Sequence, residues 1–175
     1  MQGLAIVVLS VVASIAYGIA HDLVTAHLCV EYFTIGHPKV IESQEPLALA
    51  LTWGVLATWL LGLIGGLVLA AAARLGPYPK RTFRHLVKPL GFALLAMAVL
   101  SALGGVAGHI AASQGAVKLV GDAAWRVPAD RHVAFLTNLW AHLAAYGAGS
   151  AAIVVVAAFT WRGRRSGKAT ASADE

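Results

Sequence analysis

Residues 46–73 read PLALALTWGVLATWLLGLIGGLVLAAAA and contain no charged side chain. Three further stretches share this property, at residues 3–20, 89–113 and 133–161, so all 13 basic and all 8 acidic side chains lie outside the four. An α-helix satisfies its own backbone hydrogen bonds, and about 20 apolar residues are enough to cross ~30 Å of hydrocarbon. The chain is therefore predicted to be an all-α integral membrane protein with four transmembrane helices.

The composition excludes a soluble domain. Hydrophobic residues make up 59% of the 175 residues and charged residues only 12%, against about 25% charged residues in soluble domains. The connections between the spans are short, which predicts a single domain over residues 1–161. The polar, small-residue segment 162–175 is predicted to be a disordered cytoplasmic tail. Cys29 is the single cysteine, so the chain can form no intramolecular disulfide and no thiolate metal cluster.

The distribution of charge predicts the orientation of the chain. Residues 74–88 hold five basic residues and no acidic one, and the tail after residue 161 begins with basic residues. Short loops rich in lysine and arginine stay in the cytoplasm, so both termini are predicted to be cytoplasmic. The acidic loop 21–45 and the loop 114–132 then face the periplasm of a bacterial inner membrane. Because the positive charges gather at span ends, the lipid bilayer is the expected partner and nucleic acid is not.

The first span has two interpretations. Neither glycine nor proline interrupts residues 19–35, which predicts a helix that begins near residue 3 and extends outward to about residue 33. Alternatively, Gly18-Ile19-Ala20 has the small-x-small form of a signal-peptide cleavage site. Cleavage would leave His21 as a free N-terminus. Residues 1–2, however, lack the basic side chain that is typical of the start of a signal peptide.

Polar side chains inside the spans recur at helical spacing, and each is costly in hydrocarbon unless it is paired. The three stripes are Ser10, Ser14, Tyr17 and His21 in the first span, Ser101, Gly105 and His109 in the third, and Asn138, His142, Tyr146 and Ser150 in the fourth. Spacings of three and four residues place each stripe on one helix face. We therefore expect the three stripes to meet inside the bundle.

The histidines of these stripes indicate a metal site. Imidazole is the most common nitrogen ligand for zinc, copper and iron, and His109 and His142 are expected at similar depth beneath His21 and Asp22. We expect His21, His109 and His142 to be the ligands, with Asp22 as a fourth ligand or as an orienting or catalytic carboxylate. The sequence has no H-E-x-x-H motif, so Zn, Fe and Cu all remain open.

Residues farther out complete the candidate site. His27 and Glu31 are four residues apart, which predicts a shared helix face, and Glu31 is the candidate acid/base catalyst. Asn138 is expected at the mouth of the site, with Tyr146 deeper on the same helix face.

Two G-x-x-x-G pairs, Gly62/Gly66 and Gly104/Gly108, allow helices to approach closely. The first prediction from these pairs is tight packing within the four-helix bundle. The alternative is an interface between copies of the chain in a homo-oligomer.

The stretch His21-Asp22-Leu23-Val24-Thr25, followed by Glu31-Tyr32-Phe33-Thr34, resembles an uncharacterised family of small bacterial four-helix membrane proteins. In that family a first span ends in a similar His-Asp…Thr stretch, followed by Glu-Tyr-Phe-Thr. The resemblance covers about residues 17–37, where Cys29-Val30 replaces Ser-Pro and residues 35–38 replace an aromatic-lysine run. It implies a membrane location and no particular activity. The positions to which it points are His21, Asp22, Thr25, Glu31 and Tyr32.

These observations leave several functions open. The first is a membrane metalloenzyme that acts on a lipid or another membrane-soluble molecule. The second is a haem protein for electron transfer, with His109 and His142 as axial ligands. The third is a non-enzymatic accessory or assembly subunit, in which the histidines only stabilise the bundle and the partner is another membrane protein. A small transporter is disfavoured because the spans are predicted to be unbroken.

Overall fold

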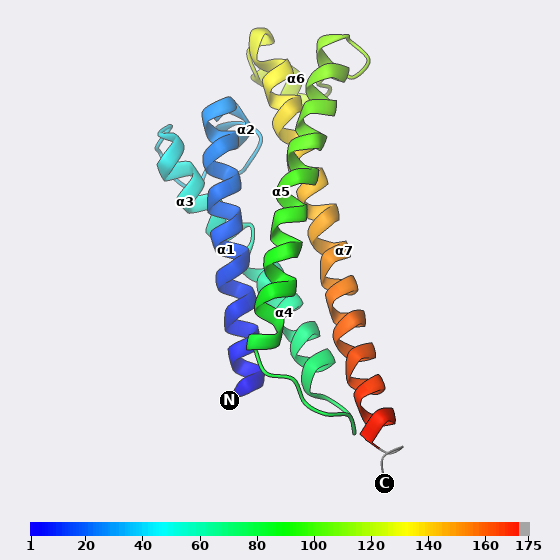
Figure 1. Ribbon diagram of the computed structural model, residues 1–175. Coiled ribbons are helices and arrows are strands. Elements are labelled where there is room, and N and C mark those ends of the chain that lie inside the picture. The colour runs from blue at the N-terminus through cyan, green and yellow to red at the C-terminus, as the bar shows by residue number, and fades with distance from the viewer. Residues whose placement is uncertain (172–175) are drawn as a thin grey trace.

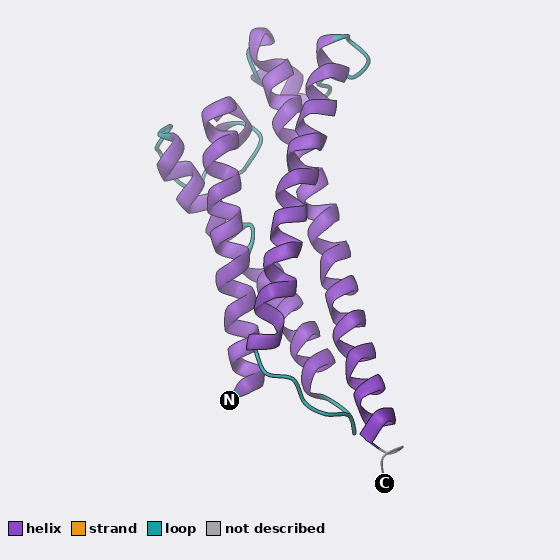
Figure 2. Ribbon diagram, in the orientation of Figure 1, coloured by secondary structure: helices purple, strands orange, loops and turns teal. Residues whose placement is uncertain are grey.

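The computed structural model describes residues 1–171, and this part of the chain consists of helices and loops without a β-strand (Figures 1 and 2). The elements are α1 (Gln2–Leu28), α2 (Val30–Thr34), α3 (Pro46–Leu56), α4 (Trp59–Arg74), α5 (Arg84–Ser113), α6 (Asp122–Arg126), the 3-10 turn η1 (Ala129–Arg131) and α7 (His132–Ala171). Four helical segments are long and apolar enough to cross a membrane, namely Gln2–Leu28, Pro46–Arg74, Arg84–Ser113 and Ala129–Ser166. The prediction of an all-α fold with four spans is confirmed.

The outer surface of the bundle is apolar, as lipid requires. Phe92 and Phe159 are 63% and 70% exposed, and Leu95 and Leu103 face outward on the same helix as Phe92. A soluble protein would bury such side chains, whereas hydrocarbon solvates them without cost.

The helices associate as two pairs. Helix α1 packs mainly against α3 and α4, and α5 packs along α7, while α4 also contacts α7 and joins the pairs. Figure 1 shows both termini at one end of the bundle and the α1–α2 and α6–α7 corners at the other. Since α1 touches α5 and α7 only sparsely, the space between the pairs is left for the cavity described below.

Glycines allow the two helices of each pair to approach each other closely. A Cβ at Gly62 or Gly66 would lie within 3 Å of the Val11 or Val7 backbone on α1, and a Cβ at Gly108 would lie 2.5 Å from Trp140 on α7. Both G-x-x-x-G pairs therefore pack inside the bundle, as the sequence predicted.

The first span is broken where the sequence predicted a continuous helix. Helix α1 ends at Leu28, because Cys29 is extended (φ −155°, ψ 97°), and α2 follows as a separate turn. Carbonyls on both sides of this break accept hydrogen bonds from α7 and from the turn before it, although Thr25 O also keeps its backbone bond from Cys29 N at 2.9 Å. Asn138 Nδ2 donates to Thr25 O (2.7 Å) and Cys29 O (3.3 Å), and Arg131 donates to Leu28 O (2.9 Å). The break thus depends on residues more than a hundred positions away, so no local signal marks it.

The second span is also interrupted, between α3 and α4 at residues 57–58. The Thr58 hydroxyl donates to the carbonyl of Gly54, and the Ser14 hydroxyl donates to the Thr58 carbonyl at 3.0 Å. The second span is thus not unbroken, and unbroken spans no longer disfavour a transporter. The break is satisfied mainly within the span, because Thr58 N turns to Val55 O and the Thr58 hydroxyl takes its place at the Gly54 carbonyl, while Thr58 O still accepts from Gly62 N at 2.9 Å.

The segment from residue 162, which was predicted to be a disordered tail, is helical in its described part, because α7 continues to Ala171. Arg164 gives the reason: its side chain is fully buried, and it donates to the carbonyls of Ala72, Leu75, Tyr78 and Pro79. These carbonyls belong to the end of α4 and the loop that follows, so the helix is held in place as far as Arg164. Residues 172–175 lie outside the described part of the chain.

We predict that Gly54→Ala lowers the thermal stability of the detergent-solubilised protein. The new Cβ would stand 2.5 Å from Ile19 N and 2.6 Å from Ile19 Cα, and backbone displacement of this kind costs about 1–3 kcal/mol. Gly91→Ala is the matched control, since nothing lies within 4 Å of its Cβ position and helix propensity favours alanine by roughly 1 kcal/mol. Equal melting temperatures for Gly54→Ala and the wild type would contradict the close approach.

Candidate metal centre

The polar stripes of α1 and α7 meet at His21, Asp22 and His142. One ring nitrogen of each histidine and one Asp22 carboxylate oxygen all lie within 4.8 Å of one another. Asp22 is only 5% exposed and His142 only 7%. A cluster of two imidazoles and a carboxylate in an apolar surrounding needs a proton or a cation to balance it.

The hydrogen bonds of His142 fix its tautomer. Its Nδ1 lies 2.8 Å from the carbonyl oxygen of Asn138, one turn earlier on α7, and its Nε2 lies 3.2 Å from Asp22 Oδ1. A carbonyl only accepts, so Nδ1 carries a proton and donates it to Asn138. The Nε2 atom is then directed at Asp22, and either a shared proton or a bound cation must lie between them.

His21 is held in the same way. Its Nδ1 lies 3.3 Å from Ser101 Oγ, and the Ser101 hydroxyl donates its own proton to Ala141 O at 3.0 Å. The Ser101 oxygen therefore accepts from His21 Nδ1–H, which leaves a lone pair on Nε2. That Nε2 atom is buried and has no hydrogen-bond partner among the described residues.

Both histidines are thus oriented as metal ligands are. In known metal sites the ring nitrogen that does not bind the ion donates to a carbonyl, a carboxylate or another polar group, which sets the tautomer. Two ligands ~2 Å from one zinc ion stand at most ~4 Å apart. The observed limit of 4.8 Å therefore requires a contraction of roughly 1 Å, which side-chain rotation can supply.

Aromatic rings enclose the cluster. The Tyr32 ring centroid lies 4.5 Å from that of His142, and Tyr17 stacks on His21 at 5.8 Å. His21 and His142 meet edge to face at 4.4 Å. These apolar ring surfaces lower the polarity around the cluster and so strengthen electrostatic interactions within it.

A cavity of about 130 Å³ opens from the cluster into the bundle. Its polar end holds His21, Asp22 and His142, whereas Leu61, Leu69, Leu90, Leu94 and Ile153 line its deeper part. On α1 the lining runs from Asp22 to Ser10, which is ~18 Å at 1.5 Å per residue. The cavity therefore joins a polar cluster to an apolar space deeper than one bilayer leaflet of ~15 Å.

His109, predicted as a ligand, does not belong to this cluster. It is exposed, and its Nδ1 lies 3.3 Å from Thr137 Oγ1. Thr137 precedes His142 by five residues, which is ~7.5 Å along the helix and more than a third of a turn around it. The structure therefore does not bring His109 and His142 together as expected, because His109 bonds to Thr137 whereas His142 lies with His21 and Asp22.

Glu31, predicted as the acid/base catalyst, takes part in a structural ion pair instead. Its carboxylate accepts hydrogen bonds from Arg131 Nε at 3.1 Å and from the Cys29 thiol at 3.3 Å. Burial disfavours its ionisation, but the hydrogen bonds from its own backbone, Cys29 and Arg131 outweigh this and hold the pKa of the carboxyl below its usual value. Burial and the bond to Glu31 raise the pKa of Cys29 to about 11, so the thiol stays protonated and acts as a donor.

His27 does not pair with Glu31, because the helix breaks between them. It is exposed and its Nδ1 donates to Leu23 O at 2.6 Å. The expected shared helix face would have required α1 to continue through Cys29.

The remaining predicted residues surround the cluster. Asn138 is fully buried, and Thr25, also buried, donates its hydroxyl to the His21 carbonyl at 3.1 Å. Both residues fix the backbone that carries the cluster. Tyr146, one turn below His142, lines the cavity.

Two residues near the cluster were not assigned a role from the sequence. Arg131 binds both Glu31 and Leu28 O, and His37 lines the cavity with its ring 4.6 Å from Trp53. Opposite charges in the two loops 21–45 and 114–132 are a signal for the first contact. No spacing in the sequence indicates that His37 lies beside Trp53 and lines the cavity.

Comparison of the chain with family models, curated proteins and solved structures found no match. The resemblance over residues 17–37 therefore stays a prediction, and the geometry of the site carries the functional argument.

We predict that Glu31→Gln destabilises the protein by about 1 kcal/mol at neutral pH, because a half-buried charged hydrogen bond is lost. The folded-state pKa of Glu31 is lowered, so its stabilisation is present above the unfolded pKa of about 4.3 and is lost as the pH falls through the folded value. Denaturation of both proteins between pH 7 and pH 3 should show the difference disappear at the acidic end.

Glu42→Gln is the control for this measurement. Glu42 pairs with Lys39, but the two side chains are 86% and 65% exposed, so the change should be within about 0.5 kcal/mol at any pH. A Glu31→Gln effect that does not vary with pH would contradict an ionised, paired Glu31.

Proposed function

We propose that this chain is a bacterial inner-membrane metalloprotein in which His21, Asp22 and His142 bind a divalent transition metal. The observation that carries the proposal is the buried Nε2 of His21, which has no partner among the described residues and belongs to a histidine whose Nδ1 is held by Ser101. His142 repeats this arrangement, with Nδ1 on a carbonyl and Nε2 toward Asp22. Two imidazoles and one carboxylate suit zinc best, and iron and copper accept the same donors.

The charge distribution supports a site that opens toward the periplasm. The basic loop 74–88 and the basic residues after 161 favour a cytoplasmic position for the end of the bundle that carries the termini. The cluster lies toward the opposite end, since His21 is near the end of α1 and His142 is near the start of α7.

The cavity supports chemistry on a membrane-soluble molecule. A zinc ion with three protein ligands keeps a position for water or a polar ligand group and activates what binds there. The carbonyl of Asn138 and the hydroxyl of Ser101 orient the two histidines, and the apolar walls exclude water from the space beneath them. A molecule with one polar end and one apolar chain fits this division, with its polar end at Asp22 and its chain between Leu61 and Leu94.

One observation favours a second function, that of an accessory or assembly subunit with structural histidines. The Asp22–His142 contact at 3.2 Å joins α1 to α7 directly, where the two helices otherwise touch only sparsely. In that case the pair would share a proton and would need no metal ion.

We predict that the purified protein binds one zinc ion per chain and that both His21→Ala and His142→Ala abolish this binding. Elemental analysis of the detergent-solubilised protein gives the stoichiometry, and titration of chelator-treated protein with Zn²⁺ gives the affinity. Ser101→Ala removes only the group that orients His21, so it should weaken zinc binding by roughly 10- to 100-fold without abolishing it.

His109→Ala is the matched control, because His109 is exposed and bonds to Thr137; zinc binding should be unchanged. A visible spectrum of the same samples tests for haem through a band near 400 nm. Absence of bound metal, together with a melting temperature that Zn²⁺ does not raise, would overturn the proposal in favour of the subunit function. Loss of zinc in His109→Ala would overturn the assignment of ligands.

A further inference from the structure

A second hollow lies at the other end of the bundle, between α5 and α7. Its volume is about 670 Å³, within the usual range of roughly 300–1,000 Å³ for ligand pockets. The loop before α5 and its first turns contribute Arg81, His85, Lys88 and Phe92, and α7 contributes Phe159 and Gly163. None of these residues belongs to the metal cluster or its cavity.

The hollow follows from the packing of the two helices. At Gly104 and Gly108 helix α5 lies against Trp140 and Ala144 of α7, whereas toward the termini the helices diverge (Figure 1). The floor of the hollow is Leu86 and Val156, which are buried in the core cluster with Ile6 and Leu69. The hollow is therefore a cleft on a packed apolar base.

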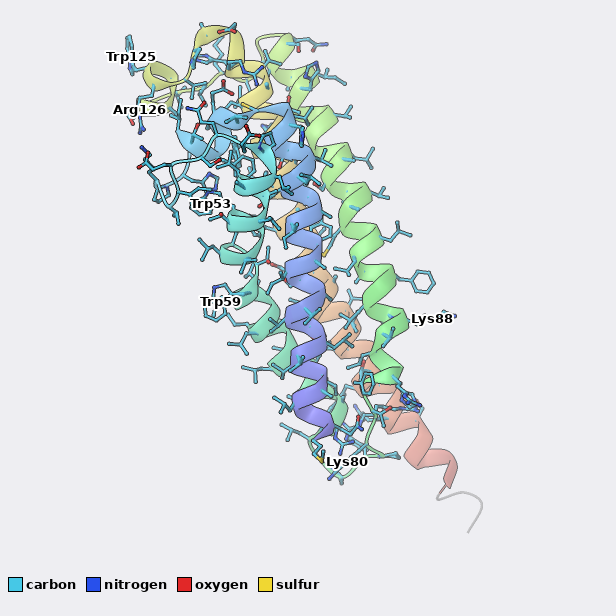
Figure 3. All side chains as sticks on the ribbon, turned by 90° about the vertical axis from the view of Figure 1, so that its left-hand side faces the viewer. Trp53, Trp59, Lys80, Lys88, Trp125 and Arg126 are labelled. Carbon is cyan, nitrogen blue, oxygen red and sulfur yellow. The ribbon has the colours of Figure 1, made fainter. Side chains whose placement is uncertain are left out.

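The cleft is basic at one end and apolar at the other. Arg81, His85 and Lys88 supply donors and positive charge, and the described residues that line the cleft include no acidic side chain. Phe92 lies one helical turn from Lys88, whose Nζ is 5.9 Å from the Phe92 ring centroid. Figure 3 shows Lys88 extending away from the bundle, with Lys80 farther down on the loop.

We propose that this cleft binds an anionic phospholipid. Its phosphate would lie against Arg81 and Lys88, and its acyl chain would run over Phe92, Val156 and Phe159. The spacing supports this division, because Lys88 and Phe92 are separated by ~6 Å along the helix, which carries a chain from headgroup depth into hydrocarbon. Phe92 and Phe159 are 63% and 70% exposed, so they are available to lipid.

The charge of the cleft selects the headgroup. Basic pockets between transmembrane helices bind anionic headgroups, and each nearby lysine or arginine contributes about 1 kcal/mol. A zwitterionic lipid of the same chain length makes the same apolar contacts but gains little from Arg81 and Lys88. The cleft is therefore expected to prefer phosphatidylglycerol to phosphatidylcholine, independently of whether the chain binds a metal ion.

The test is native mass spectrometry of the full chain in detergent, titrated with phosphatidylglycerol or with phosphatidylcholine of the same acyl composition. The wild type should bind phosphatidylglycerol at least tenfold more tightly. The double variant Arg81→Gln/Lys88→Gln should lose roughly 10- to 30-fold in affinity for phosphatidylglycerol, with little change for phosphatidylcholine. Lys80→Gln removes a charge from the same loop outside the cleft and should bind like the wild type.

A second pair of variants tests the cleft by its shape. Gly163 lines the cleft and has nothing within 4 Å of a built Cβ, so Gly163→Leu should fill the cleft and weaken binding of phosphatidylglycerol. Gly147, also on α7 and equally open, lies outside the cleft, and Gly147→Leu should not affect binding. Equal affinity for both lipids, an equal loss in Lys80→Gln, or full binding by Gly163→Leu would each overturn the proposal.

Discussion

Hydrocarbon offers no water to a polar group, so every carbonyl outside a helical hydrogen bond must find a donor within the protein. Helix α7 and the turn before it supply these donors at both ends of the bundle. Near its start, Asn138 and Arg131 donate to carbonyls at the point where α1 ends. Near its other end, Arg164 donates to the carbonyls where α4 ends. Side chains of this one segment therefore bind carbonyls at the ends of two other helices, α1 and α4.

The same requirement locates the cluster of His21, Asp22 and His142. The Asn138 side-chain amide donates to a carbonyl of α1, and its backbone carbonyl accepts from His142 Nδ1. One residue therefore both binds the end of a helix and orients a candidate ligand. Its Oδ1 and the Nε2 of His21 are buried without partners among the described residues. An unpaired buried polar atom costs about 1–3 kcal/mol, and such costs are typical of sites that a ligand or ion completes.

Charge and spacing in the sequence were sufficient for the four spans, because apolar length alone decides what crosses a bilayer. Spacing was also sufficient to place His21, Asp22 and His142 together. Polar side chains that recur about every four residues lie on one helix face, and that face must turn away from lipid. It failed for His109 because spacing does not report how far one helix is rotated against another. It failed for Glu31 because the break at Cys29 is made by Arg131 and Asn138, which lie far away in sequence. From the sequence, Arg164 is expected only as one of the charges that set orientation, whereas its burial depends on carbonyls of α4 and the following loop that no sequence pattern indicates.

The position of Arg164 also sets the order in which the protein is completed during synthesis. About ninety residues separate the end of α4 from Arg164, and at ~5–20 residues per second a ribosome needs roughly 5–20 s to make them. Throughout that interval the carbonyls of Ala72 and Leu75 lack the guanidinium that binds them in the finished protein. The nascent chain therefore inserts three spans while these carbonyls lack this donor, and the hydrogen bonds form only after Arg164 has been synthesised.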